Sequence, residues 1–125
     1  EESSCGLVIK PNMTLVFKGG FGYIITVERW ILNTTPHRLC YKVESSCPDL
    51  FFIRNGYGFL EGYGHGTVIL SLNRQRKKPK NLEHFFSFYH KKAEDGFDHE
   101  KIWADDTNPQ GVYRQRCIID LTGEE

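Results

Sequence analysis

Short apolar runs alternate with turn residues along the whole chain, and this spacing limits the folds that the chain can adopt. The predicted strands are rich in β-branched and aromatic side chains and cover Leu7–Ile9, Leu15–Phe17, Tyr23–Leu32, Leu39–Val43, Leu50–Arg54, Thr67–Leu72, Phe85–Tyr89 and Val112–Leu121. Turn residues separate them, and Asn55-Gly56 is a strong turn dipeptide. Only residues 94–104 show a weak helical pattern. Short strands at this spacing predict an all-β domain, either an antiparallel sandwich or a barrel.

One segment departs from the strand pattern through its glycine content. Residues 56–66 hold five glycines, interleaved with aromatic side chains. A phosphate-binding loop needs its glycines between a strand and the start of a helix, whereas a strand follows here. We therefore predict a glycine-rich turn or bulge.

A second segment is strongly basic. Arg74–Lys80 holds five basic residues in seven, although the whole chain is neutral, with 16 basic and 16 acidic side chains. The run is interpreted as a solvated loop, which Pro79 and the neutral total favour. The alternative, a nucleic-acid site, predicts binding that weakens steeply with salt.

The length of 125 residues fits a single domain, which we expect over residues 1–125 with a core from about residue 7 to residue 121. A chain of this size buries roughly two thirds of its unfolded surface and does not require disulfides. No apolar run approaches the roughly 18 residues of a membrane helix, and no secretory signal is recognised. We expect membrane contact only through a partner or a segment outside this chain.

The chain has four cysteines, at Cys5, Cys40, Cys47 and Cys117. They form no CxxC pair and have no histidine at zinc-site spacing. We therefore predict no metal site, no cofactor and a reducing, intracellular compartment. The glycosylation triplets at Asn12 and Asn33 are interpreted as chance matches.

No catalytic arrangement is recognisable in the sequence, and we do not expect an enzyme. None of the five histidines sits in a nucleophile motif, and no Gly-x-Ser-x-Gly elbow occurs. His99-Glu100 lacks the second histidine of a zinc helix. Asp105-Asp106 is predicted to form a loop turn capped by Asp106 or Thr107, because adjacent strand residues point to opposite faces.

Four segments together resemble a known family. "LVIKPNMTLVFKGGF" has an apolar strand, a proline and a second strand ending in a basic residue and glycine. "LNTTPHRLCYKVESS" has an Asn-x-Thr turn, an aromatic-Lys-Val strand and paired hydroxyls, and "FFIRNGYGFLEGYGHGTVILSL" has an Asn-x-Gly turn and a glycine loop between strands. "WADDTNPQGVYRQRCIIDL" closes with an Arg-x-Arg strand after a loop. These segments, from about Leu7 to Leu121, resemble the major sperm protein domain of nematode sperm proteins and of the vesicle-associated-membrane-protein-associated (VAP) proteins.

The resemblance implies an immunoglobulin-like, seven-stranded antiparallel β-sandwich, in agreement with the strand pattern. It also implies a non-catalytic protein-protein interaction module. Our leading expectation is a cytoplasmic, sperm-type cytoskeletal protein that self-associates into a homo-oligomer, or an adaptor. The alternative is a VAP-type receptor domain at the cytosolic face of the endoplasmic reticulum. Such a domain binds FFAT-like peptides, in which two phenylalanines lie in an acidic tract.

The resemblance also implies a binding face. In VAP relatives, basic side chains receive the acidic flank of the peptide and an apolar pocket receives a phenylalanine. Strand alternation predicts that Leu39, Tyr41 and Val43 point inward, and that Cys40, Lys42 and Glu44 point outward. The candidate peptide-binding residues, which match the family's positions or lie beside them, are Lys42, Glu44, Ser45, Ser46, Phe85, Ser87, Arg114 and Arg116.

Three candidates depart from the VAP pattern. Glu44 stands where VAP relatives carry a second lysine, and Phe85 and Ser87 stand where they carry a lysine and a methionine. A carboxylate at position 44 repels an acidic peptide, at a cost of order 1 kcal/mol. Two interpretations stay open: a retained peptide groove, or ordinary solvated charges on a sheet.

Overall fold

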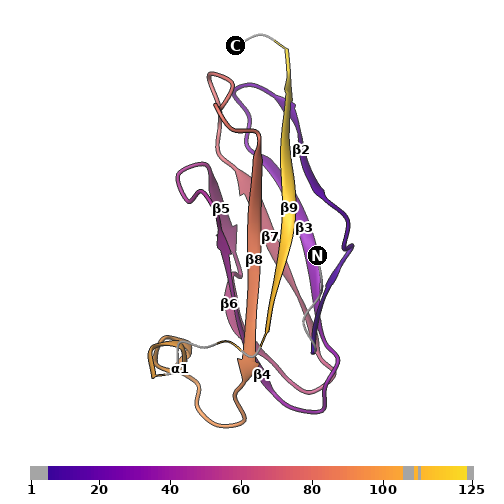
Figure 1. Ribbon diagram of the computed structural model, residues 1–125, viewed down its shortest axis with the longest axis vertical. Helices are drawn as coiled ribbons and strands as arrows, with labels where there is room; N and C mark the ends of the chain where they lie inside the picture. Colours follow the sequence, from indigo (N-terminus) through magenta and orange to yellow (C-terminus); the bar gives the residue numbers. More distant parts are fainter. Residues whose placement is uncertain (1–5, 106–108, 110, 124–125) are drawn as a thin grey trace.

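The strand pattern folds into two stacked sheets that share one long axis (Figure 1). A computed structural model describes residues 6–105, 109 and 111–123. Its elements are β1 (Leu7–Lys10), β2 (Leu15–Gly20), β3 (Ile25–Asn33), β4 (Leu39–Ser45), β5 (Phe51–Arg54), β6 (Tyr57–Leu60), β7 (His65–Leu72), β8 (Glu83–Lys92), α1 (His99–Asp105) and β9 (Gly111–Thr122). Cys5 and the predicted turn cap at Asp106 or Thr107 lie outside the described residues.

The strand order confirms the predicted all-β, immunoglobulin-like sandwich. One sheet has the order β1-β3-β7-β5, and the other has the order β2-β9-β8-β4-β6. The described pairs are antiparallel except β2–β9, which is parallel from Leu15↔Cys117 to Gly20↔Thr122. The expectation of a purely antiparallel sandwich is therefore corrected at this edge.

The described residues form nine strands, where eight runs were predicted and the resemblance implies seven strands. β6 was not predicted, and at two places the chain crosses from one sheet to the other between consecutive strands. β1 and β2 join different sheets on either side of Pro11, which has no N–H to donate to a ladder. β5 and β6 likewise join different sheets, divided at Asn55-Gly56, where Asn55 has a φ of 58°. The turn predicted there is confirmed, but it moves the chain from one sheet to the other instead of closing a hairpin.

The glycine-rich segment is a strand followed by a tight turn. The prediction of a turn or bulge over residues 56–66 missed β6, which pairs with β4 from Leu39↔Leu60 to Lys42↔Tyr57. A Cβ atom at Gly62 would lie 2.3 Å from the carbonyl oxygen of Pro36. Only glycine allows the two turns to approach so closely.

Aromatic side chains fill the space between the sheets. Phe17 and Phe51 have ring centroids 5.2 Å apart, and Phe51 and Phe86 have centroids 5.0 Å apart. Burying each ring contributes roughly 2–3 kcal/mol. Because β8 turns Phe86 and Phe88 into this core, its alternate residues must point to the outer face.

A buried polar pair determines which residues of β9 point inward and which point outward. Arg29 is only 6% exposed, and its Nε donates to Oε1 of Gln115 at 3.1 Å. Gln115 in turn donates to the carbonyl oxygens of Pro11 and Met13 at 3.1 and 3.0 Å. Burial lowers the pKa of Arg29 from its ordinary value. Since Gln115 points inward, Arg114 and Arg116 on either side of it point outward.

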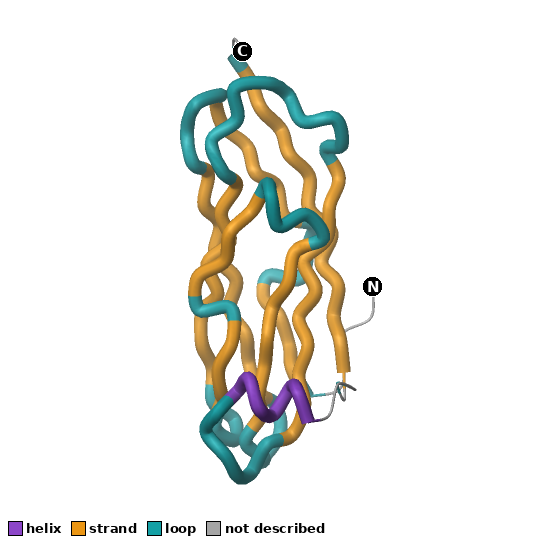
Figure 2. Tube along the Cα trace, turned by 90° about the vertical axis from the view of Figure 1, so that its left-hand side faces the viewer, coloured by secondary structure: helices purple, strands orange, loops and turns teal. Residues whose placement is uncertain are grey.

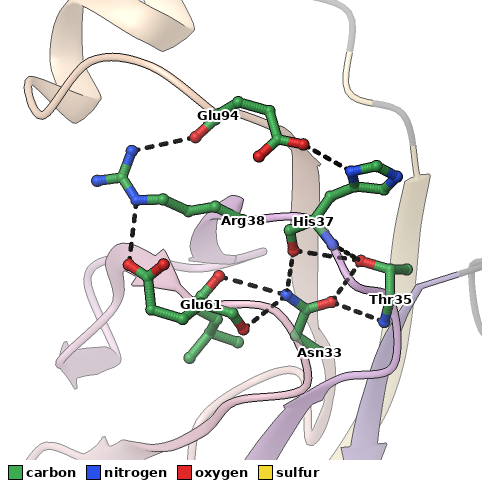
Figure 3. A network of polar contacts seen from close by, with 8 residues as sticks. Asn33, Thr35, His37, Arg38, Glu61 and Glu94 are labelled. Atoms are coloured by element: carbon green, nitrogen blue, oxygen red, sulfur yellow. Dashed lines mark hydrogen bonds and ion pairs between the residues drawn. The ribbon is translucent and has the colours of Figure 1, made fainter.

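One end of the sandwich is held by a buried asparagine (Figure 3). Nδ2 of Asn33 donates to the carbonyl oxygens of His37, Leu60 and Glu61 at 2.6, 3.3 and 2.9 Å. Its Oδ1 accepts from the backbone N–H and the hydroxyl of Thr35 at 3.0 and 2.8 Å. The Asn33 amide is thus a structural group that joins the β3–β4 and β6–β7 turns.

Candidate functional site

The strand register places most of the predicted site residues in adjacent rows on the outer face of the five-stranded sheet. Glu44 pairs with Ser87, and Ser87 pairs with Arg114, so these three side chains form one row across β4, β8 and β9. Phe85 pairs with Arg116 in the next row. Lys42 pairs with Tyr89, which pairs with Val112 in the row on the other side.

The two candidate serines behave differently from each other. The hydroxyl of Ser46 accepts from the backbone N–H of Phe85 at 3.0 Å, and its own N–H donates to the Phe85 carbonyl oxygen at 2.8 Å. Ser46 therefore extends the β4–β8 contact beside the outer rows. Ser45 pairs with the buried Phe86, so alternation puts it on the core side, and the structure does not bring it to the outer face.

Helix α1 covers one end of this face (Figure 2). Trp103 packs over Cys40 and Ala93, and Cys40 has no exposed surface. Lys91 Nζ donates to the carbonyl oxygen of Ile102 at 2.7 Å. Alternation placed Cys40 outward correctly, but the helix buries it.

Arg38 stabilises the loop between β8 and α1. It donates to the carbonyl oxygens of Ala93 and Gly96 at 3.1 and 2.7 Å. Its guanidinium also lies 3.9 Å from the ring centroid of Phe59, and its Nε is 3.3 Å from Oε2 of Glu61. The covered end of the face is thus held by several contacts at once.

Two of the candidate cations on the outer face of the five-stranded sheet are partly neutralised by neighbouring glutamates. Lys42 Nζ lies 3.6 Å from Oε2 of Glu44, and it also lies over the rings of Tyr89 and Trp103. Arg116 is 2.6 Å from a carboxylate oxygen of Glu83. Both cations therefore present less positive potential than their side chains alone would.

Arg114 stands apart from these pairs. Its Nε donates to the hydroxyl of Ser87 at 3.4 Å, and within the described part of the chain no carboxylate lies within ion-pair distance of it. Burial of this side chain is low, so its guanidinium is open to solvent. It is the candidate cation best placed to meet an incoming carboxylate.

A groove of about 520 Å³ runs beside Arg114. Its lining residues are Asn12, Thr14, Phe85, Val112, Tyr113, Arg114, Gln115 and Arg116. Phe85 is 46% exposed and Val112 is 39% exposed, so an apolar surface adjoins the cation. Sequence reasoning missed Val112, although alternation from Arg114 would have placed it on this face.

A second hollow of about 480 Å³ lies between α1 and the end of the sheet. Lys42, Glu44, Tyr57, His99, Glu100 and Trp103 are among its lining residues. The rings of Tyr57 and His99 are stacked with centroids 3.8 Å apart. Sequence reasoning missed this hollow, because the hydrophobic pattern of a seven-residue helix does not predict where the helix packs.

The described cysteines are separate, free thiols. Burial raises the pKa of the Cys117 thiol to about 12, and burial also raises the pKa of Cys40. Among the described residues, no three His, Cys, Asp or Glu side chains gather closely enough to hold a metal ion. Nor does a helix in the described ranges have the length and apolar character needed to cross a membrane.

Comparison with known proteins matches residues 6–112 to the model of the MSP (Major sperm protein) domain. The chain belongs to this family. A vesicle-associated membrane protein/synaptobrevin-binding protein from Aplysia californica is 28% identical over 120 residues, covering 92% of this chain and 46% of the relative. The human vesicle-associated membrane protein-associated protein B/C is 23% identical, covering 94% of this chain and 50% of the relative. The chain therefore spans about half the length of these curated relatives.

Solved structures show the same fold. WR4, a C. elegans MSP family member, superposes with a TM-score of 0.72 at 18% identity, covering 90% of this chain and 96% of that one. The C. elegans MSP-domain protein SSP-19 gives a TM-score of 0.72 at 17% identity, covering 90% of this chain and 97% of that one. The MSP family consists of non-enzymatic interaction domains, and membership supports a protein-interaction module.

Proposed function

We propose that this domain is an adaptor that binds an extended, phenylalanine-containing acidic peptide across β8 and β9. The observation that carries the proposal is Arg114, a cation with only a neutral side-chain partner among the described residues, beside the exposed Phe85 and Val112. An apolar peptide side chain would lie against Phe85 and Val112, and a peptide carboxylate would bind Arg114. A protein or peptide is therefore the expected partner.

The proposed site is displaced from the position that the VAP pattern implies. Glu44 already lies against Lys42, so an acidic peptide gains little from that lysine. The Glu83–Arg116 pair similarly reduces the attraction of Arg116. The acidic part of the ligand is therefore expected at Arg114, two strands away from Lys42.

The relatives favour the VAP-type interpretation over the sperm-type one. The VAP relatives match in sequence over 92% to 94% of this chain, whereas the nematode proteins match in fold at 17% to 18% identity. On this assignment, the domain lies at the cytosolic face of the endoplasmic reticulum.

A residue-resolved NMR titration tests the proposal. The peptide should shift Phe85, Ser87, Val112 and Arg114, and Arg114→Gln should weaken binding about tenfold. The matched control is Arg54→Gln, an exposed arginine on the opposite sheet, which should bind as the wild type does. Equal affinity of the two variants would contradict the proposal.

Charge reversal at Glu44 gives a second test. Glu44→Lys should free Lys42 and strengthen peptide binding by about tenfold, since it removes a repulsive carboxylate and adds a cation. Glu28→Lys makes the same charge change on the other sheet and serves as the control. A gain in both variants would mean that net charge, not this face, controls binding.

Self-association is the second candidate function. It is favoured by exposed apolar residues on the same outer face: Val16 is 47% exposed, Phe85 46% and Val112 39%. A sperm-type cytoskeletal role would use this strip to join copies of the chain in the cytoplasm. Sedimentation velocity over a concentration series distinguishes the two, because an adaptor stays monomeric while a self-associating protein sediments faster as its concentration rises.

A further inference from the structure

The loop between β7 and β8 concentrates positive charge at one end of the molecule. It lies at the end opposite α1, where β9 also ends (Figure 1). Its five cations are all exposed: Arg74, Arg76, Lys77, Lys78 and Lys80. In the part of the chain that the structure describes, none of the five is within ion-pair distance of a carboxylate. This cluster, the basic loop, is a local charge on a chain that is neutral overall.

The β2–β3 turn brings apolar side chains beside the basic loop. Gly22 donates its backbone N–H to the carbonyl oxygen of Gln75 at 3.0 Å, which ties the turn to the first part of the loop. Tyr23 in this turn is 70% exposed, and Ile24 is 44% exposed. The end of the sandwich therefore presents an aromatic ring and a branched apolar side chain next to five cations.

The neighbouring carboxylates that the structure describes do not neutralise these cations. Glu83, at the start of β8, is engaged by Arg116. Asp120 on β9 lies opposite Lys18 on β2. Asp49, in the loop after β4, contacts Asn73, the residue before the basic loop. This contact uses the backbone carbonyl oxygen of Asp49, which accepts from the Asn73 side chain.

We propose that this end of the domain docks directly on an anionic lipid bilayer. The basic loop would lie over the headgroups, while Tyr23 and Ile24 would enter the interfacial layer. Clustered lysines and arginines are attracted to anionic leaflets, and aromatic and branched side chains partition into the water–lipid interface. The inference goes beyond the proposed peptide site, which lies on the sheet face and stays open in this orientation.

A nucleic acid is the competing polyanion, and the structure favours the bilayer over it. Single-strand sites combine a positively charged groove with stacking aromatics. No cation of the basic loop lines either of the two hollows described above. The Ile24 side chain has no donor or charge for a phosphate group, but it can enter the boundary between lipid headgroups and acyl chains. The sequence-based expectation of membrane contact only through a partner or a segment outside this chain rested on the absence of a membrane-length apolar run. It did not consider the basic run together with Tyr23 and Ile24.

Vesicle flotation tests the proposal with vesicles of phosphatidylcholine alone and of phosphatidylcholine mixed with phosphatidylserine. The wild-type chain should float with the mixed vesicles at low salt, and should not float with phosphatidylcholine alone. The triple variant Arg76→Gln, Lys77→Gln, Lys78→Gln should bind about a hundredfold more weakly, since each cation contributes roughly fivefold. The double variant Tyr23→Ser, Ile24→Ser should bind about tenfold more weakly.

The matched control removes three exposed cations elsewhere, by Lys10→Gln, Arg54→Gln and Lys101→Gln, and should float as the wild type does. Thermal unfolding of every variant checks that it is folded. The proposal is overturned if the wild type fails to float with phosphatidylserine, or if the control loses as much binding as the triple variant. It is also overturned if the Tyr23, Ile24 variant floats normally while the chain binds an oligonucleotide more tightly than the vesicles, because the loop is then a nucleic-acid site.

Discussion

At the α1 end of the sandwich, one buried asparagine side chain bonds to the backbone of two turns, and Arg38 fastens the loop before the helix. At the other end, the described bonds come from several separate groups, among them Gly22 to Gln75, Asn73 to the β4–β5 loop and Asn81 to Glu83. The first end uses its polar groups to hold the chain, whereas the second leaves its charges facing solvent. A polar side chain's worth to stability therefore depends on how many backbone groups it satisfies, and the groups not used for stability are free for binding.

The largest expected difference between the ends comes from their asparagines. Asn33→Ala removes the donor to the carbonyl oxygens of His37, Leu60 and Glu61 and the acceptor of the two Thr35 donors, and should cost about 3 kcal/mol. Asn81→Ala at the other end removes one exposed bond, to the N–H of Glu83, and should cost less than about 1 kcal/mol. Urea unfolding measures both, and equal losses would break the comparison.

Arginine substitutions should give the next largest difference. Arg38→Met keeps an apolar stem against Phe59 but loses the bonds to Ala93 and Gly96, so we expect a loss of about 1–2 kcal/mol. Arg76→Met makes the same change in the basic loop and should alter the unfolding free energy by no more than about 0.5 kcal/mol. If Arg76→Met proves as costly as Arg38→Met, the basic loop has a structural role that the contacts do not show.

The His37–Glu94 contact should give the α1 end a dependence on acid pH. The hydrogen bond from His37, at 2.6 Å, lowers the pKa of Glu94 below its ordinary value of 4.5, and a bond from the Arg38 backbone adds to this. A carboxyl whose pKa is lower in the folded state stabilises the fold above about pH 4.5, and this contribution is lost as the pH falls through the folded-state pKa. Urea unfolding between about pH 6 and pH 3 should therefore show a shallower fall for Glu94→Gln than for the wild type. Parallel curves would mean that the contact is not kept in solution.

The smallest effect, and one of opposite sign, is expected in the basic loop. Lys78→Gln removes a like charge from a cluster of exposed cations, and should stabilise the fold by a few tenths of a kcal/mol at low salt. The gain should vanish at high salt, where the repulsion is screened. Destabilisation that persists in high salt would show that Lys78 has an attractive partner.

Much of the binding face could be predicted from the sequence, because side-chain alternation in a strand is a property of the backbone. Lys42 and Glu44 on β4 were placed on the correct side for this reason, whereas Arg114 and Arg116 on β9 entered the candidate set through the family resemblance. The same rule assigns Ser45 to the core side, and following the family's paired hydroxyls instead put it in the candidate set. The row that joins Glu44, Ser87 and Arg114 was not predictable, since the register between strands depends on the packed core.

The features missed from the sequence are those in which a local pattern is weak or is overridden by packing. β6 was hidden because Gly56 and Gly58 have low strand propensity, and its pairing with β4 decides its conformation. Cys40 points outward as alternation requires, yet Trp103 of a short helix covers it. β1 and β2 were predicted as separate strands, but the different sheets that they join, like those of β5 and β6, were not predicted, because this choice is a property of the whole fold.

The parallel pairing of β2 with β9 also determines how the domain responds to mechanical force. Among the described strands β2 is the second and β9 is the last, and the two run in the same direction through six paired positions. Tension that draws Leu15 and Thr122 apart acts along both strands in opposite directions, so the ladder is loaded in shear. All its hydrogen bonds then share the load at once, whereas a hairpin pulled at its open end loses them one after another. When force acts on the domain through these two strands, it is thereby expected to unfold slowly.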